Sequence, residues 1–236
     1  MGIGPNVCRL FVEFRVGEAD PAGLLSRLDQ HLTVGPRERA DDPAAWPRVE
    51  GYVAGVVARF AADPRVLGWD IYNEPGNSGR MVRSLPLLKA AFGWARQASP
   101  SQPLTSAVWA WDDTFRGINE FLLSESDVIS YHDYSLVGRG REIMDGLREY
   151  GRPLLYTEWM ARTMGSRFET HLPVFREEDV GCFFWGLVNG RTQTHLPWGS
   201  AEGAPPPQVW FHDLLDSRGE PFDSEEVALI RREHSR

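Results

Sequence analysis

The chain has 236 residues, 42% of them hydrophobic and 25% charged, as in a globular protein with room for one sizeable domain. Its net charge of −8 argues against a nucleic-acid-binding protein, because such a protein needs a basic surface to neutralise phosphates. No stretch approaches the roughly 18 apolar residues of a membrane span, and the start MGIGPNVCRL has no signal-peptide pattern, so we expect no membrane partner and a cytoplasmic location.

Apolar runs of strand length alternate along the chain with amphipathic segments of helix length, which is the pattern of repeated β-α units. In chain order we expect a strand at Val7–Phe14, a helix at Pro21–Leu32, a polar loop at Thr33–Trp46, a helix at Arg48–Ala62, a strand at Val66–Tyr72, a helix at Leu85–Ala98, a strand at Leu104–Trp109, a helix at Phe115–Ser124, a strand at Asp127–Tyr131, a helix at Arg141–Tyr150, a strand at Pro153–Thr157, a helix at Ser166–Glu178, a strand at Gly181–Val188 and a helix at Ser224–Glu233. This alternation predicts a parallel sheet, and the six strands fit either an open doubly wound sheet or an incomplete barrel.

The two cysteines, Cys8 and Cys182, lie inside apolar strand-like runs and are expected to be reduced core thiols. No CxxC pattern is present, so neither a disulfide framework nor a zinc site is indicated.

Two glutamates occupy matching positions in the predicted sheet. Glu74 follows Asn73 at the end of the strand in VLGWDIYNEPGN, and Glu158 ends the strand in RPLLYTEWMAR. The carboxyl ends of parallel strands are where α/β sheets and barrels place their sites. Hydrolysis of a glycosidic bond needs such a pair, since one carboxylic acid protonates the leaving oxygen and one carboxylate attacks the anomeric carbon. Either glutamate alone would be equally consistent with a solvated loop residue.

This order of motifs resembles the clan of (β/α)8 glycoside hydrolases that contains the family 5 cellulases and mannanases, and the resemblance runs from Arg9 to about Trp210. It implies that Glu74, closing a strand equivalent to the fourth, is the acid/base. It also implies that Glu158, closing a strand equivalent to the seventh, is the nucleophile.

Further positions match the clan one by one. Arg9 resembles the second-strand arginine that keeps the nucleophile ionised, and Asn73 resembles the asparagine that binds the sugar 2-hydroxyl. His132 and Tyr134 match the sixth-strand His-x-Tyr pattern, which implies a histidine near the acid/base and a tyrosine hydroxyl near the nucleophile. Trp185 matches the eighth-strand tryptophan beneath the sugar that is cleaved.

Tryptophan is enriched, with nine residues, and several lie at or just past expected strand ends, where flat rings can stack on sugars. Trp109 and Trp159 are therefore further expected substrate contacts, and Trp198 is a weaker one. Asp112 and Asp113 could also bind a sugar, as could one or two of the residues Asn189, Arg191, Gln193 and His195.

The sequence departs from the clan at its amino-terminal side. The clan has eight strands, whereas nothing here precedes the strand equivalent to the second, and the polar segment Thr33–Trp46 stands where a third is expected. The chain could be a fragment, a minimal barrel closed by other segments, or part of an assembly with a partner.

These observations predict a single α/β domain over residues 1–236, a (β/α)8 barrel of the TIM type that is incomplete at its amino-terminal side. The expected activity is that of a retaining β-glycoside hydrolase acting on cellulase-, mannanase- or xylanase-like oligo- or polysaccharides, with no cofactor and no metal. One alternative is a non-catalytic carbohydrate-binding remnant of such a barrel. A Ser-His-Asp hydrolase is disfavoured, because no GxSxG nucleophile motif is present.

Overall fold

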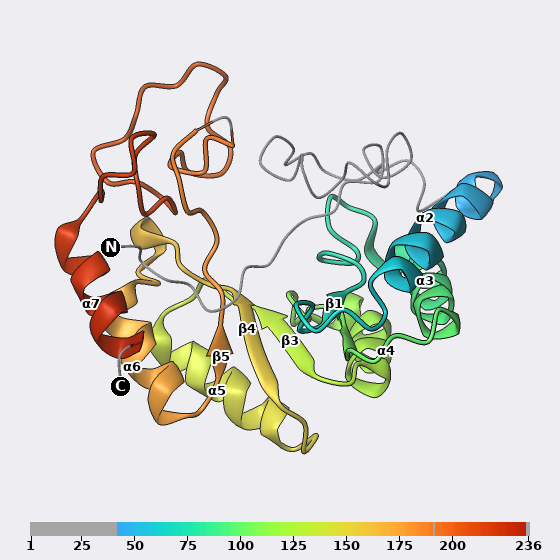
Figure 1. Ribbon diagram of the computed structural model, residues 1–236. Helices are drawn as coiled ribbons and strands as arrows, with labels where there is room; N and C mark the ends of the chain where they lie inside the picture. The colour runs from blue at the N-terminus through green and yellow to red at the C-terminus, as the bar shows by residue number, and fades with distance from the viewer. Residues whose placement is uncertain (1–41, 191, 235–236) are drawn as a thin grey trace. The chain divides into compact units, whose positions relative to one another are not determined.

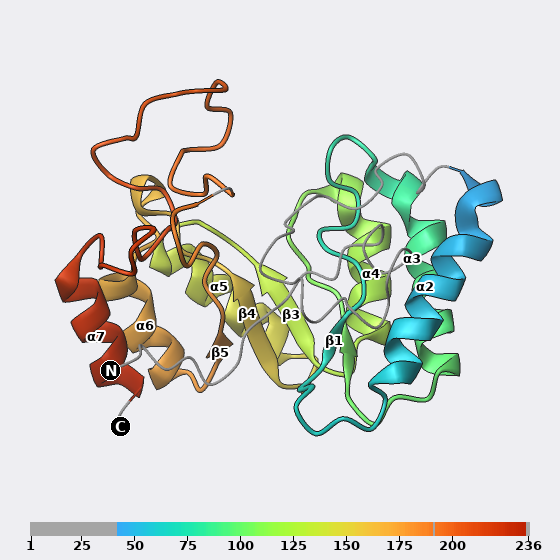
Figure 2. The same ribbon diagram turned by 45° about the horizontal axis from the view of Figure 1, so that its top comes forward.

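A computed structural model describes residues 42–190 and 192–234 of the chain (Figures 1 and 2). Its internal contacts divide these residues into two compact units: residues 42–130 form the first unit, and the remaining described residues, from 131 onwards, form the second. None of the described helices is both long and apolar enough to cross a membrane. The expected strand Val7–Phe14 and helix Pro21–Leu32 lie outside the described residues, as does Cys8.

The first unit is built largely from helices. Its helical segments are η3 (Pro43–Ala45), α2 (Trp46–Arg59), η4 (Met81–Ser84), α3 (Leu85–Gln97), η5 (Asp113–Phe115) and α4 (Arg116–Glu125). Helices α2 and α3 lie side by side (Figure 2), and Trp46 packs edge-on against Trp94. Phe92 of α3 meets Phe121 of α4 in the same edge-on way, with ring centroids 5.4 Å apart. The apolar faces predicted from the sequence therefore form the core of this unit.

Two short parallel strands of the first unit precede the segments that contain Glu74 and Trp109. Strand β1 (Trp69–Asp70) pairs with β2 (Leu104–Thr105), and the backbone N–H of Ile71 extends the pairing by donating to Thr105. Beyond β2 the chain changes partner, since the N–H of Val108 donates to the carbonyl of Ser130.

The second unit contains alternating strands and helices. Its elements are β3 (Ile129–His132), which begins in the first unit, α5 (Val137–Arg148), β4 (Leu154–Glu158), η6 (Arg162–Met164), α6 (Phe168–Glu177), β5 (Gly181–Cys182) and α7 (Ser224–His234). The strands form one sheet in the order β3-β4-β5, and β4 and β5 are parallel. Helix α6 also contacts α7, and both lie at the same side of this unit in Figure 1.

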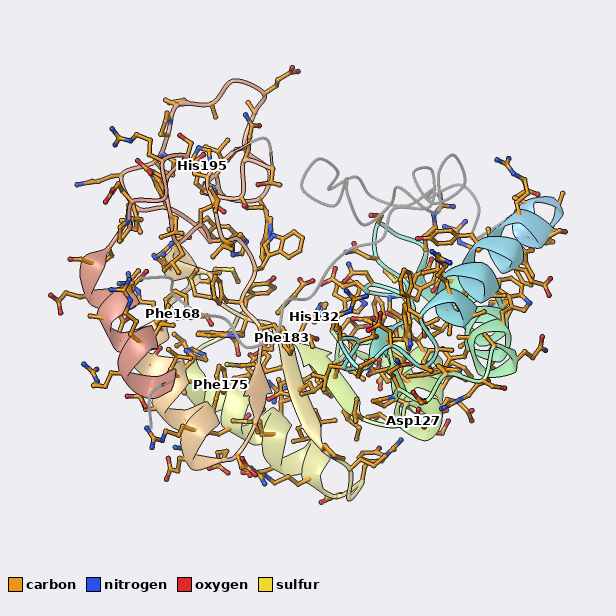
Figure 3. All side chains as sticks on the ribbon, viewed as in Figure 1. Asp127, His132, Phe168, Phe175, Phe183 and His195 are labelled. Carbon is orange, nitrogen blue, oxygen red and sulfur yellow. The ribbon has the colours of Figure 1, made fainter. Side chains whose placement is uncertain are left out.

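Aromatic side chains fill the space between this sheet and α6. Tyr131 of β3 stacks on Tyr156 of β4 with ring centroids 4.3 Å apart, and Phe175 of α6 packs on Tyr156 at 5.0 Å. Phe168 and Phe175 lie along α6 in Figure 3, and both are buried. This packing fixes the strand that ends in Glu158.

The described strands are shorter than the sequence predicts, except β4, which has the predicted length and is shifted by one residue. The run Gly181–Val188 forms a strand only over Gly181–Cys182, and Gly186, farther along the run, adopts a left-handed backbone conformation (φ 86°). Leu187 then accepts hydrogen bonds from the backbone of Leu214 and Leu215. Cys182 has a free thiol, as expected, but its side chain is only half-buried. The described strands form separate sheets of two and three strands.

Candidate active site

Glu158 is the last residue of β4, and its side chain is buried next to two polar side chains. The hydroxyl of Tyr134 donates a hydrogen bond of 2.9 Å to Oε2 of Glu158. Nδ1 of His132, the last residue of β3, lies 3.5 Å from the same oxygen (Figure 3). The structure thus brings together three of the residues that the sequence selects, on adjacent strands of one sheet.

Backbone and tyrosine contacts hold the ends of these two strands together. The N–H of Asp133 donates to the carbonyl of Glu158 (3.1 Å), and the buried Tyr156 hydroxyl donates to the carbonyl of Asp133 (2.5 Å). Burial beside Asp133 raises the pKa of Tyr156 far above its usual range, so this hydroxyl keeps its proton and remains a donor. Glu158 therefore ends a well-anchored strand.

Aromatic rings also pack around Tyr134. We call Tyr134, Trp198, Phe211 and His212 the aromatic wall. Tyr134 and Trp198 meet edge-on with centroids 4.9 Å apart, and the His212 ring lies 5.5 Å from Tyr134 and 5.4 Å from Trp198. Trp198 and Phe211 also meet edge-on, at 4.8 Å. Phe211 and His212 follow a Pro-rich stretch and match no motif, so the sequence did not point to them.

Arg162 anchors the segment that carries Phe211 and His212. Its buried guanidinium forms a bidentate pair with Glu226 of α7, at 2.8 and 2.6 Å. The same guanidinium donates through Nη1 to the carbonyls of Trp210, His212 and Asp213. A single arginine after β4 therefore links the aromatic wall to the carboxy-terminal helix.

Two of the expected substrate-binding tryptophans in the second unit have different surroundings. Trp159 is fully buried, stacks on His171 at 5.5 Å and meets Phe168 and Phe175 edge-on, so it belongs to the core and exposes no ring face to a sugar. Trp185, beyond β5, is half-buried. The glycine after it lies so close to His212 that an added Cβ would fall 2.7 Å from the Cβ of that histidine.

Glu74 lies in the loop after β1 of the first unit, with an unusual backbone. Its φ of 45° is in the left-handed region, which is rare for a residue with a side chain. Nδ2 of Asn77 donates to Oε2 of Glu74 at 2.5 Å, while Oδ1 of Asn77 accepts from the backbone of Ser78. Asn73, the expected ligand of the sugar 2-hydroxyl, is exposed next to it.

The loop that carries Glu74 is packed tightly against its own unit. The indole N–H of Trp109 donates to the carbonyl of Pro75 at 2.9 Å, and Trp109 meets Phe115 edge-on. A Cβ on Gly76 would fall 2.6 Å from Phe115, so only glycine fits there without movement. Trp109 thus contacts the backbone next to Glu74.

The weaker candidates have local partners. Asp112 caps η5, and a hydrogen bond from Thr114 lowers the pKa of Asp112; Asp113 pairs with Arg116. Nδ1 of the buried His195 lies 3.7 Å from Oδ2 of Asp213. Arg9 and Arg191 lie outside the described residues.

Comparison with known proteins relates this architecture to enzymes that act on sugars. No protein-family model and no curated protein sequence matches the chain. An endo-β-1,4-xylanase of glycoside hydrolase family 10 from Gloeophyllum trabeum matches with a TM-score of 0.56 at 12% identity, over 92% of this chain and 79% of that one. A β-glucuronidase from Bacteroides uniformis matches with a TM-score of 0.61 at 13% identity, over 85% of this chain and 28% of that one.

A glycoside hydrolase of family 5, subfamily 18, from Streptomyces cattleya, solved in complex with GlcNAc, is similar as well. Its TM-score is 0.58 at 14% identity, over 87% of this chain and 56% of that one. The chain therefore spans little more than half of this enzyme and about a quarter of the glucuronidase. At such low identity the likeness concerns the fold, which is a mixed α/β fold with parallel strands whose neighbours are glycoside hydrolases.

Proposed function

We propose that the chain is a retaining β-glycoside hydrolase built on an incomplete (β/α)8 barrel, with Glu158 as nucleophile and Glu74 as acid/base. The observation that carries the proposal is the surroundings of Glu158. Its buried carboxylate, at the carboxyl end of β4, accepts a hydrogen bond of 2.9 Å from the hydroxyl of Tyr134 and lies 3.5 Å from Nδ1 of His132. Strand ends of this kind are where parallel α/β folds place catalytic groups.

In the first step, an oxygen of Glu158 attacks the anomeric carbon and forms a covalent ester with the sugar. The bond from that carbon to the leaving oxygen breaks, and Glu74 gives its proton to that oxygen. In the second step, water attacks the anomeric carbon and passes a proton to Glu74, and Glu158 leaves as a carboxylate. Two inversions give net retention, which requires carboxyl groups about 5–5.5 Å apart.

The remaining residues serve these steps. The hydroxyl of Tyr134 orients the Glu158 carboxylate and stabilises its charge, since a hydrogen bond to an ionised acceptor is stronger than one between neutral groups. Asn73 binds the sugar 2-hydroxyl, and Trp185 supports the sugar that is attacked. Arg9, which lies outside the described residues, is assigned from the resemblance alone to keeping the nucleophile ionised. The substrate class is β-linked oligo- or polysaccharide, and no cofactor or metal takes part in these steps.

A second candidate is a carbohydrate-binding remnant that has lost turnover. The sheets favour this candidate, because the described residues form one sheet of two strands and one of three, and no closed barrel of eight strands. Such a protein would keep the aromatic residues while lacking the geometry that brings two carboxyl groups to one sugar.

The deciding experiment is hydrolysis of a panel of aryl β-glycosides by the wild type, Glu74→Ala and Glu158→Ala, with the exposed Glu149→Ala as a matched control. We expect each active-site variant to lose roughly a hundredfold or more in rate, as is typical when a catalytic acid, base or nucleophile is removed. Added azide should restore Glu158→Ala and give a glycosyl azide of inverted configuration. With Glu74→Ala the azide product should keep the configuration of the substrate.

Equal loss in the Glu149→Ala control would contradict the assignment. A folded wild type that binds oligosaccharides but hydrolyses none of the aryl glycosides supports the remnant instead.

A further inference from the structure

Trp198 is the most exposed tryptophan for which the structure records contacts with other rings. Trp198 is 58% exposed, so more than half of its surface is open to water. It therefore forgoes much of the stabilisation of about 2–3 kcal/mol that burial of a large aromatic side chain ordinarily contributes. An uncovered aromatic face is the usual partner of the C–H face of a sugar ring.

Trp198 is held in place although it is exposed. Three rings of the aromatic wall support it: Tyr134 at 4.9 Å, Phe211 at 4.8 Å and His212 at 5.4 Å. A pre-positioned ring binds more tightly than a mobile one, because less conformational entropy is lost when the ligand arrives. Trp111 provides the contrast, since it is 37% exposed and has no ring contact with another described residue.

The rings behind Trp198 are themselves fixed. Phe211 and His212 are buried, and Nδ1 of His212 donates to the carbonyl of Met160 at 2.5 Å. The carbonyl of Phe211 accepts the N–H of Arg162, whose guanidinium binds the next carbonyls along the chain. The platform therefore rests on the buried part of the second unit and not on a surface loop alone.

Tyr134 connects Trp198 to Glu158. Tyr134 touches both residues, with its hydroxyl on Glu158 and its ring against Trp198. Trp198 thus lies one side chain away from the proposed nucleophile.

We infer that Trp198 forms a stacking subsite for a second sugar unit, so that the preferred substrate is a β-linked oligosaccharide of at least two units. This inference rests on the proposed function, because it takes Glu158 as the reacting centre. It assigns Trp198 to binding a neighbouring unit and not to the chemical step.

The experiment compares Trp198→Ala and Trp198→Phe with Val209→Ala, an exposed apolar control from the same region. Binding of β-1,4-linked tetrasaccharides of glucose, mannose and xylose is measured by calorimetry on the full chain carrying Glu158→Ala, so that turnover does not interfere. Hydrolysis of aryl β-monoglycosides is measured in the otherwise wild-type chain. We expect Trp198→Ala to weaken tetrasaccharide binding about tenfold, with Trp198→Phe intermediate and Val209→Ala unchanged. Hydrolysis of the aryl monoglycosides by Val209→Ala should stay within about twofold of the wild-type rate.

The outcomes separate this inference from the proposed function. Unchanged tetrasaccharide binding by Trp198→Ala overturns the subsite even when the wild type hydrolyses aryl glycosides. Weakened tetrasaccharide binding by Trp198→Ala, together with a wild type that cleaves no aryl glycoside, supports sugar stacking on Trp198 and overturns the proposed hydrolysis. A wild type that binds none of the tetrasaccharides overturns the subsite whether or not aryl glycosides are cleaved.

Discussion

The hydroxyl of Tyr134 donates a 2.9 Å hydrogen bond to the carboxylate of Glu158, from one strand end to the next. A hydrogen bond to a charged group contributes about 1.5–3 kcal/mol, so Tyr134→Phe should lower kcat/KM for aryl β-glycosides roughly tenfold to a hundredfold. The benzene ring remains, and packing against Trp198 and His212 should survive. The melting temperature is therefore expected to change little, and an unchanged kcat/KM would contradict a role for the hydroxyl.

Trp109 is expected to act on Glu74 through the backbone. Trp109→Phe keeps the contact with Phe115 but removes the N–H that donates to Pro75. Loss of this bond loosens the loop, and kcat should fall by about tenfold, the effect of roughly 1.4 kcal/mol. Oligosaccharide binding by the Glu158→Ala background should not change. A loss of binding with unchanged kcat would instead make Trp109 a sugar contact.

His212 should make the protein less stable in acid. Burial lowers the pKa of His212 to about 4, below its ordinary 6.5, so the folded state takes up the proton less readily than the unfolded state. The contribution to the free energy of unfolding is complete above about pH 6.5 and disappears as the pH falls towards about 4, a loss of about 3 kcal/mol. Urea denaturation as a function of pH measures it. In His212→Asn, the amide can still donate to Met160, but the free energy of unfolding should fall by about 3 kcal/mol less than in the wild type over this pH range. The same pH dependence in both proteins would refute the assignment.

The pair between Arg162 and Glu226 should be strongly coupled. Removing one partner leaves a buried charge, so Arg162→Met should cost about 3–5 kcal/mol of the free energy of unfolding. Glu226→Gln should cost less, since the amide oxygen still accepts a hydrogen bond. The double variant Arg162→Met/Glu226→Leu should be more stable than the sum of the single losses predicts. It should remain below the wild type, because three carbonyls lose their donor. Strictly additive losses in a urea-denaturation cycle would rule out the coupling.

Much of the local structure follows from the sequence. Helices α3 and α4 fall within a residue or so of the expected ranges, because their apolar residues recur at helical spacing. The contact between Tyr134 and Glu158 is one that the resemblance to the clan implies, whereas the spacing of two predicts only that His132 and Tyr134 share one face of an extended segment.

Other features depend on distant parts of the chain. Arg162 and Glu226 are 64 residues apart, and no pattern in the sequence pairs an arginine after a strand with an acid in the last helix. The left-handed backbone of Gly186 and its close approach to His212 are likewise not predicted by the apolar run that contains this glycine. Trp159 looks like Trp185 in sequence, because each follows a strand, yet the side chains packed on α6 make Trp159 a core residue.

The left-handed backbone of Glu74 has an evolutionary consequence. A residue with a side chain pays about 1–2 kcal/mol for such a conformation, which glycine adopts without strain, so Glu74→Gly would relieve the loop while removing the proposed acid/base. Selection for stability alone therefore favours replacement at this position, and only selection for chemistry retains the glutamate. In lineages descended from this chain, position 74 should be among the first to drift once hydrolysis is no longer needed.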